Sequence, residues 1–223
     1  MIKLIAFDWN GTLLSDTYQT YLSNNYTFAK VGLKPISLLK FKQTFDVPIM
    51  NIYISNGMSK PAFLKVAEKQ SKIYHEYYEK QVTKVRTRGG VRALLLWLQK
   101  NSIDSIIYSN RTHSGINFQL KRLKIEKLIS KTLANDHGHQ NTKTRSKDLK
   151  LFEYIKSKKY KPNEVISIGD TEEEIEIGKK FGFHTVALTG GYQTTAKLKK
   201  KKPDFLIHNM LELKKIIKQL NKV

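Results

Sequence analysis

The chain of 223 residues contains 40% hydrophobic and 26% charged residues, the balance of a globular protein long enough for one domain and an insertion. It has no apolar stretch of the ~18 residues that a membrane span needs, and we expect no signal peptide. The absence of cysteine excludes disulfides, thiol catalysis and zinc–thiolate sites. We therefore expect a cytoplasmic protein.

The net charge of +21 arises from 40 Lys and Arg against 19 Asp and Glu. Such a field attracts anionic partners, whether phosphorylated substrates, nucleic acid or an anionic membrane. A lysine-rich bias of the coding sequence would give the same composition, because the excess is mainly lysine spread along the whole chain. The low-complexity run of Lys197 with residues 199–202 is interpreted as a solvated loop rather than a binding arm.

The first predicted element is a strand at residues 4–7, an apolar run of the kind that is buried on both faces of a parallel sheet. The run ends at a carboxylate, Asp8, and Gly11 then allows the chain to turn. Ligands bind at this end of the strands in open α/β sheets. Asp8 is therefore a candidate nucleophile or metal ligand, and a role as a simple cap of the next segment is the alternative.

Residues 16–87 differ from the rest because they are rich in Tyr and Lys and contain no clear buried strand. The apolar spacing from Phe63 to Tyr77 is helical, and loops are predicted near residues 32–35, Pro48 and residues 56–57. The pattern indicates a helical insertion.

From residue 88 onward, helical and strand patterns alternate. Helices are predicted at 91–99, 116–123, 148–157, 172–181 and 211–220, and strands at 105–108, within 128–133, and at 165–168, 185–188 and 203–207. Strands that alternate with helices indicate an α/β fold with a doubly wound parallel sheet. We expect residues 1–15 and 88–223 to form the core domain and residues 16–87 a second, helical domain.

Polar side chains recur where these strands end. Asp8 follows the first strand, Ser109 and Asn110 follow a later one, and Asp170 follows another, while Lys147 precedes a helix that leads to the Asp170 strand. Carboxylates suit Mg²⁺, and a hydroxyl, an ammonium and main-chain N–H groups suit phosphate oxygens. Asp8 would then be able to attack phosphorus and form an aspartyl-phosphate.

The chain resembles the haloacid dehalogenase (HAD) superfamily, in the phosphoglycolate-phosphatase-like branch with a helical cap. The resemblance rests on residues 8–12 (DWNGT), 106–110 (IIYSN), Lys147 and residues 167–171 (SIGDT), and it extends to the GGY of residues 190–192 and the strand near 203–207. It implies a Rossmann-like core, a cap formed by residues 16–87, Mg²⁺ as cofactor and a small phosphorylated substrate.

The same resemblance assigns the site. It implies that Asp8, Asn10, Ser109 and Lys147 carry the reaction and that phosphate is bound by Trp9, Asn10, Ser109, Asn110 and Lys147. It implies metal ligands at Asp8, Asn10 (through its carbonyl), Asp170 and Glu174. Lys143 and Lys150 are alternatives to Lys147 as the phosphate-binding lysine.

Two residues depart from the family pattern. Asn10 occupies the position of a second Asp that protonates the leaving group and activates water, and an amide does neither. That assistance is typically worth ~10²–10⁴ in rate. Glu174 stands where Asp is common, and because Mg²⁺ demands tight geometry we expect it to act through a bound water.

Three functions are therefore open. The first is a Mg²⁺-dependent phosphomonoester hydrolase acting on a small metabolite, slowed by Asn10. The second is a phosphate-binding or regulatory protein impaired by Asn10, and the third is a phosphatase of nucleic-acid ends. Arg111 is placed to reach a second anionic group of a substrate or to lie on the surface, and the tyrosines of residues 16–87 either stack on substrate or belong to the helical core and surface.

Overall fold

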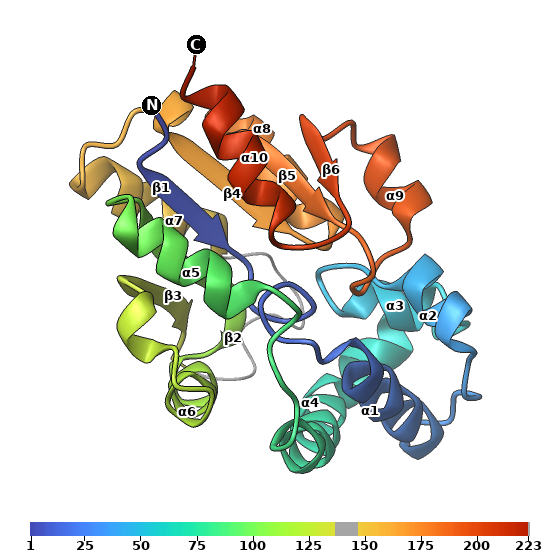
Figure 1. The fold of residues 1–223 in the computed structure, drawn as a ribbon. Helices are drawn as coiled ribbons and strands as arrows, with labels where there is room; N and C mark the ends of the chain where they lie inside the picture. Colours follow the sequence, from blue (N-terminus) through green and yellow to red (C-terminus); the bar gives the residue numbers. More distant parts are fainter. Residues whose placement is uncertain (137–146, 223) are drawn as a thin grey trace.

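The computed structural model describes residues 1–136 and 147–222, which form a parallel sheet flanked by helices and a group of helices beside it (Figure 1). Within these residues the sheet has six strands in the order β3-β2-β1-β4-β5-β6, all parallel. The strands are β1 (Leu4–Phe7), β2 (Asp104–Thr112), β3 (Lys131–Asn135), β4 (Val165–Gly169), β5 (His184–Leu188) and β6 (Phe205–Ile207). The predicted α/β doubly wound sheet is confirmed.

Side chains of β1 alternate between two buried layers. Ile5 and Phe7 pack with α5 (Val91–Lys100), α6 (His113–Arg122) and α10 (Glu212–Leu220), whereas Leu4 and Ala6 pack with α7 (Lys147–Ser157) and α8 (Glu172–Phe181). All four β1 side chains are fully buried. Helices therefore cover both faces, which is why this strand reads as a continuous apolar run.

The order of the strands reverses beside β1. After β1 the chain builds β2 and β3 on one side, and β4, β5 and β6 then follow on the other side. A crevice forms where the order reverses, at the carboxyl ends of β1 and β4. Asp8 and Asp170 directly follow these two strands, so the topology alone brings them together.

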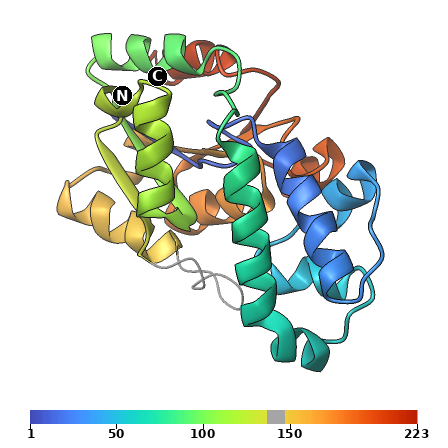
Figure 2. The same ribbon diagram turned by 90° about the horizontal axis from the view of Figure 1, so that it is seen from below.

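Between β1 and α5 the chain forms four helices that we call the helical segment. They are α1 (Thr17–Lys30), α2 (Leu38–Thr44), α3 (Met50–Ile54) and α4 (Lys60–Val82). Helices α1 and α4 run side by side, seen from below in Figure 2, and the segment has an aromatic core of its own that includes Phe28, Phe41 and Tyr53. The predicted helical character and loop positions of residues 16–87 are confirmed.

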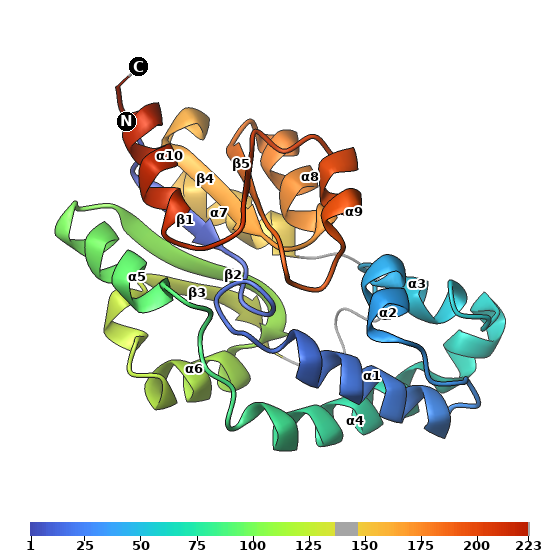
Figure 3. The same ribbon diagram turned by 45° about the vertical axis from the view of Figure 1, so that its right-hand side comes forward.

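Two chain segments connect the sheet to the helical segment, residues 13–15 on the way out and residues 86–88 on the way back. We call them the crossings, and they are hydrogen-bonded to each other. The Ser15 N–H donates to the Arg86 carbonyl, the Arg88 N–H donates to the Leu13 carbonyl (both 3.0 Å), and Leu14 bridges Thr87 in antiparallel fashion. Figure 3 shows the outgoing and returning chain meeting below the sheet. The crossings form a short two-stranded connection.

Some elements differ from the prediction. Strand β2 is longer at both ends than the predicted 105–108, since pairing with β1 and β3 holds polar residues in an extended form. The interpretation of the lysine run as a loop was wrong for its first half, because Thr195–Lys200 form helix α9, anchored by the buried Leu198. None of the helices in the described part of the chain combines the length and apolar character that crossing a membrane requires.

Candidate active site

A cavity of about 160 Å³ lies between the carboxyl end of the sheet and the helical segment. Its lining includes residues from several strand ends that the sequence analysis selected: Asp8, Asn10, Ser109, Asn110, Lys147 and Glu174. Residues of α1 and α4 and of the stretch 45–49 face them from the helical segment. The structure therefore gathers most of the predicted site residues around one cavity.

Two selected residues are not part of the lining. Asp170 is fully buried behind the turn after β1. The Trp9 side chain is fully buried among the residues packed against α5, so any contact of Trp9 with phosphate is left to its main chain.

Lys147 lies at the start of α7 with its side chain buried among three carboxylates. Its Nζ is 3.2 Å from Asp8 Oδ1 and 2.9 Å from Glu173 Oε2, and it also donates to Glu174 Oε1. Burial alone would lower the pKa of the Lys147 ammonium, but the charges of Asp8, Glu173 and Glu174 raise it well above its ordinary value. Lys147 is therefore a permanent cation beside Asp8.

The alternatives to Lys147 are resolved only in part. Lys150 points away from the cavity, since its Nζ donates to the Ala134 carbonyl and to Asn135 Oδ1 (2.9 Å to the latter). Lys143 lies outside the described residues.

Asp170 is held tightly behind the turn that follows β1. Its Oδ1 accepts from Thr12 Oγ1 and its Oδ2 from the Tyr192 N–H, each at 2.6 Å. Side chains at Gly11 or Gly191 would overlap its carboxylate, so glycine is required for this close approach. Burial, with the nearby Glu174 charge, raises the pKa of Asp170 to about 7.

The Asp8 carboxyl shares this electrostatic environment. Burial raises the pKa of Asp8 well above its ordinary value; the Lys147 charge opposes the shift, and those of Glu174 and Asp170 add to it. Three buried acids, Asp8, Glu173 and Glu174, thus face one ammonium, and the buried Asp170 lies close enough for its charge to act on Asp8. This excess of buried negative charge, carried on oxygen atoms, fits a divalent cation such as Mg²⁺.

The donor set suits Mg²⁺ in number as well as in kind. Mg²⁺ in proteins is usually bound through one or two carboxylates and retains several waters. Asp8 and Asp170 supply two carboxylates and the Asn10 carbonyl a third oxygen, and no group of three acidic or histidine side chains among the described residues is arranged as a fuller cage. Both oxygens of Glu174 accept hydrogen bonds, Oε1 from Lys147 and Oε2 from Thr171 Oγ1 (2.6 Å), as both oxygens of Asp170 do. That Glu174 acts through a bound water therefore stays a prediction.

Ser109 and Asn110 lie at the end of β2, and Ser109 is buried. Asn110 Nδ2 donates to Glu173 Oε2 (2.9 Å), and the Asn110 carbonyl accepts from Asn135 Nδ2 (2.9 Å). These contacts hold this part of β2 in place, and Ser109 lines the cavity together with Lys147.

Asn10 is paired with a carboxylate that the sequence did not single out. Asn10 Nδ2 donates to Asp16 Oδ2 (2.6 Å) and to the Tyr78 hydroxyl (2.8 Å). Asp16 is fully buried, and the same Oδ2 accepts from the hydroxyls of Tyr78 (2.5 Å) and Tyr192 (2.7 Å), while Oδ1 accepts from the Gly11 N–H (2.7 Å). An acid just before a helix is usually read as an N-cap, yet Asp16 makes no side-chain cap here.

Arg88, on the returning crossing, joins two loops of the site. Its Nη1 donates to the Gly11 carbonyl (2.9 Å) and its Nη2 to the Thr189 carbonyl (2.6 Å). One side chain therefore supports both the turn after β1 and the loop after β5.

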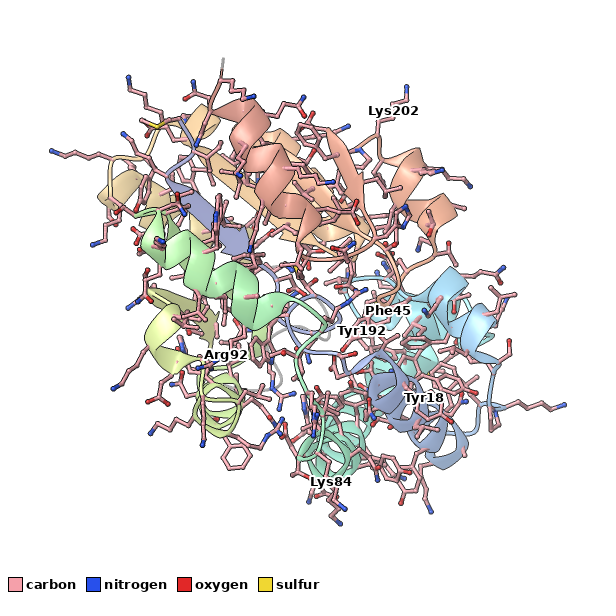
Figure 4. The ribbon with its side chains drawn as sticks, in the orientation of Figure 1. Tyr18, Phe45, Lys84, Arg92, Tyr192 and Lys202 are labelled. Carbon is pink, nitrogen blue, oxygen red and sulfur yellow. The ribbon has the colours of Figure 1, made fainter. Side chains whose placement is uncertain are left out.

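Aromatic residues close the cavity from the helical segment. Tyr74 and Tyr78 of α4 line it, whereas Tyr18 and Tyr26 are exposed. The side chains of Tyr192 and Phe45 meet where the loop after β5 touches the end of α2 (Figure 4), with ring centroids 4.7 Å apart. The tyrosines of the helical segment thus divide among the cavity lining, the aromatic core, which contains Tyr53, and the surface.

Glu173 is a second residue that sequence reasoning missed. It stands in a run of glutamates at a helix start, where acids are expected for their effect on the helix dipole alone. In the structure it is 3% exposed and pairs with Lys147. The available signal was its spacing, three residues after Asp170.

Comparisons with known proteins agree with this geometry. The profile of the haloacid dehalogenase-like hydrolase family matches residues 5–188. The chain is 23% identical over 226 residues to the pyrophosphatase PpaX of Bacillus mycoides, covering 99% of each chain. It is 21% identical over 220 residues to a phosphoglycolate phosphatase of Pseudomonas savastanoi pv. phaseolicola, covering 95% of this chain and 78% of the relative.

A solved structure of a haloacid dehalogenase-like family hydrolase from Streptococcus pneumoniae superposes with a TM-score of 0.80 at 21% identity, covering 97% of this chain and 98% of the other. This likeness shows a shared fold. Because the family profile spans most of the sequence, the chain belongs to the haloacid dehalogenase-like hydrolases, which confirms the resemblance carried by its motifs and identifies it as an enzyme of the hydrolase type.

Proposed function

We propose that the protein is a Mg²⁺-dependent phosphomonoester hydrolase that acts on a small phosphorylated metabolite through an aspartyl-phosphate on Asp8. The observation that carries the proposal is the buried Asp8–Lys147 pair, 3.2 Å apart, facing a cavity at the carboxyl end of β1. A carboxylate nucleophile beside a permanent cation is what attack on a phosphoryl group needs.

The residues divide the work as follows. Asp8 attacks phosphorus, the bond from phosphorus to the ester oxygen breaks, and the leaving oxygen takes a proton from water and departs as the alcohol. The Lys147 ammonium and the Ser109 hydroxyl hold phosphoryl oxygens while charge develops on them. Water then attacks the aspartyl-phosphate, which releases inorganic phosphate and restores the Asp8 carboxylate. Mg²⁺, bound by Asp8, Asp170 and the Asn10 carbonyl, would neutralise phosphoryl charge.

We further propose that residues 16–87 act as a cap domain over a core formed by residues 1–15 and 88–223. Tyr74 and Tyr78 reach into the cavity from this segment, so its position determines the space left for substrate. At about 160 Å³ the cavity is smaller than the ~300–1,000 Å³ of typical ligand pockets, which supports a small metabolite over a nucleic-acid end. The relatives named for pyrophosphate and phosphoglycolate agree with a compact substrate. A cytoplasmic location stays a prediction.

The direct test is steady-state hydrolysis of p-nitrophenyl phosphate and a panel of small phosphorylated metabolites, with and without Mg²⁺. We expect metal-dependent turnover that falls by at least ~10³-fold in Asp8→Asn, since the nucleophile is lost. Turnover that survives in Asp8→Asn would contradict the proposal.

A second candidate function is favoured by the amide at residue 10. A protein with this site that binds Mg²⁺ and inorganic phosphate but releases no product would be a phosphate-binding or regulatory protein. Calorimetric titration with phosphate, run beside the turnover assay, separates the two functions because only the hydrolase shows both binding and release.

A further inference from the structure

We propose that Arg111 binds a second anionic group of the substrate, so that the preferred substrates are compact phosphomonoesters carrying a carboxylate or a further phosphate. This inference rests on the proposed hydrolase and adds the class of substrate to it. The sequence left Arg111 open between a substrate contact and the surface, and the structure removes the second choice.

Arg111 is a buried cation in the lining of the same cavity. Its side chain is 7% exposed, and it lines the cavity together with Asp8, Ser109 and Lys147. The cost of burying a guanidinium is large unless anions or hydrogen-bond acceptors meet it. The Glu79 carboxylate in the wall meets part of this need, and an anion in the cavity would reach the donors that Glu79 does not use.

The contacts of Arg111 use only some of the N–H donors of its guanidinium. Both oxygens of Glu79 accept from a single nitrogen, Nη2 (2.8 and 2.9 Å), and the guanidinium lies 4.7 Å from the centre of the Tyr78 ring. Nε is buried and meets no acceptor in the described part of the chain, and neither does Nη1. A guanidinium carries five N–H donors, so most of the hydrogen-bonding capacity of Arg111 is uncommitted.

The position of Arg111 on β2 sets the spacing of the two anion sites. Ser109 and Arg111 are two residues apart on the strand, and the Arg111 N–H donates to Ser109 Oγ (3.3 Å). Alternate residues of a strand face the same side and are ~7 Å apart. That separation suits a phosphoryl group at Ser109 joined to a second anion by a linker of a few atoms, which also fits the small cavity.

The placement of Arg111 is rigid. The Tyr78 ring lies on one side of the guanidinium, and on another Nε passes so close to α6 that a Cβ on Gly115 would lie 2.7 Å from it. A cation fixed in this way loses little side-chain freedom when it binds an anion. A planar guanidinium also recognises carboxylate and phosphate with more geometric specificity than an ammonium does.

The competing role for Arg111 is to hold the helical segment against the sheet, because Glu79 and Tyr78 both belong to α4. The two roles differ in one measurable respect. A holding contact affects every substrate equally, whereas an anion site affects only substrates that carry the second anion.

The test compares kcat/KM for phosphoglycolate and ethyl phosphate, which differ in that a carboxylate replaces a methyl group. Ethylene glycol bisphosphate forms a further arm, in which the second anion is a phosphate and the bond that breaks is again that of an alkyl phosphomonoester. The variants are Arg111→Met, Arg111→Lys and, as matched control, Glu79→Gln, which removes the holding contact but keeps the guanidinium. All are measured with Mg²⁺ and the full chain.

We expect wild type to prefer phosphoglycolate, ethylene glycol bisphosphate or both over ethyl phosphate by at least ~10-fold. Arg111→Met should reduce that preference roughly 10–100-fold, the effect of one or two charge-assisted hydrogen bonds. Arg111→Lys, which keeps the charge, should lose less, and Glu79→Gln should keep or raise the preference. If Arg111→Met does not fold, Arg111→Lys and Glu79→Gln still distinguish the roles.

Equal losses on all substrates in the Arg111 and Glu79 variants, with the preference unchanged, would overturn the inference and leave the hydrolase intact. The same holds if wild type shows no preference. A wild type that hydrolyses none of the probes or the metabolite panel would instead overturn the proposed hydrolase and the inference with it.

Discussion

Asn10 Nδ2 lies 2.6 Å from Asp16 Oδ2. Because a carboxylate only accepts hydrogen bonds, Asp16 fixes the orientation of the amide and turns Asn10 Oδ1 away from itself. Asn10 lines the cavity, and its Oδ1 forms no hydrogen bond with the described residues. The carboxylate that an acid–base role at residue 10 would require is thus present nearby, at residue 16, behind an amide.

Exchanging the two residues is the sharpest test of this pair. Asn10→Asp alone places a second buried carboxylate against Asp16, which we expect to cost about 1–3 kcal/mol because two buried acceptors then face each other. The double change Asn10→Asp with Asp16→Asn keeps the hydrogen bond and the charge count. We expect the double variant to be more stable than Asn10→Asp alone but less stable than wild type, because an amide at residue 16 has one acceptor oxygen for the hydroxyl and N–H donors that Asp16 binds with two. We also expect it to hydrolyse alkyl phosphates ~10–100-fold faster, since residue 10 gains an ionisable group.

The measurements are thermal unfolding and kcat for an alkyl and a p-nitrophenyl ester. The effect should be larger for the alkyl ester, whose leaving group needs protonation. A double variant that is less stable than Asn10→Asp, or that gains equally on both esters, would show that the pair does not act in this way.

The close approach of Gly191 to Asp170 predicts that a side chain at residue 191 would displace the Asp170 carboxylate. A Cβ at residue 191 would overlap the Asp170 carboxylate, whereas a Cβ at Gly89 meets no atom within 4 Å, and neither backbone is left-handed. We expect Gly191→Ala to weaken Mg²⁺ binding and to lower kcat/KM by at least ~10-fold, because small displacements of site groups are costly. Gly89→Ala is the control and should match wild type in Mg²⁺ titrations. Equal behaviour of the two variants would contradict the requirement for glycine at 191.

Replacing Lys147 should lower the free energy of unfolding substantially. Lys147→Met leaves Asp8, Glu173 and Glu174 without their shared cation, and the loss of one partner from a buried charge cluster typically costs about 3–5 kcal/mol. Lys150→Met removes a lysine that bonds neutral acceptors and should cost no more than ~1 kcal/mol. Urea unfolding at pH 8 measures both. A loss below ~1 kcal/mol for Lys147→Met would show that the acids do not depend on it.

The raised pKa of Asp170 predicts that the effect of Mg²⁺ on stability depends on pH. Its pKa is raised from 3.8 to about 7, so the folded protein binds this proton more tightly than the unfolded chain. Without metal, the contribution of Asp170 to stability is therefore greatest at low pH and is lost as pH rises from about 4 through about 7. Mg²⁺ competes with the proton, so it should stabilise the protein more at pH 8 than at pH 6.

Thermal unfolding with Mg²⁺ and with a chelator, at both pH values, measures this difference. Asp170→Asn should abolish most of it. A Mg²⁺ effect that is the same at pH 6 and pH 8 would show that Asp170 does not bind the metal.

Much of the fold follows from local pattern. Helix α8 was predicted with the observed limits, 172–181, because acids at its start, apolar residues at helical spacing and Gly182 at its end all agree. Strand β2 was predicted short because residues 109–112 are polar, and only pairing with its neighbours extends it. Helix α9 was missed since its anchor is one buried residue, Leu198, among lysines.

The site was predictable where residues follow strands and unpredictable where distant segments meet. Asp8 and Asp170 are adjacent because β1 and β4 are, which the alternation of elements already indicates. Tyr78 reaches Asn10 from α4, 68 positions along the chain, and no local pattern reports that contact. The part played by Asp16 depends on hydroxyl groups from two separate segments, so it emerges only in three dimensions.

The hydrogen-bonded pairing of the two crossings has a consequence for engineering the enzyme. Since Leu13 and Ser15 share hydrogen bonds with Arg88 and Arg86, a residue inserted in one crossing alone shifts its register against the other. The shift also withdraws Arg88 from the Gly11 and Thr189 carbonyls. Grafting a different helical segment onto this sheet therefore requires both crossings to be kept together as a matched set, with new sequence joined between residues 17 and 82.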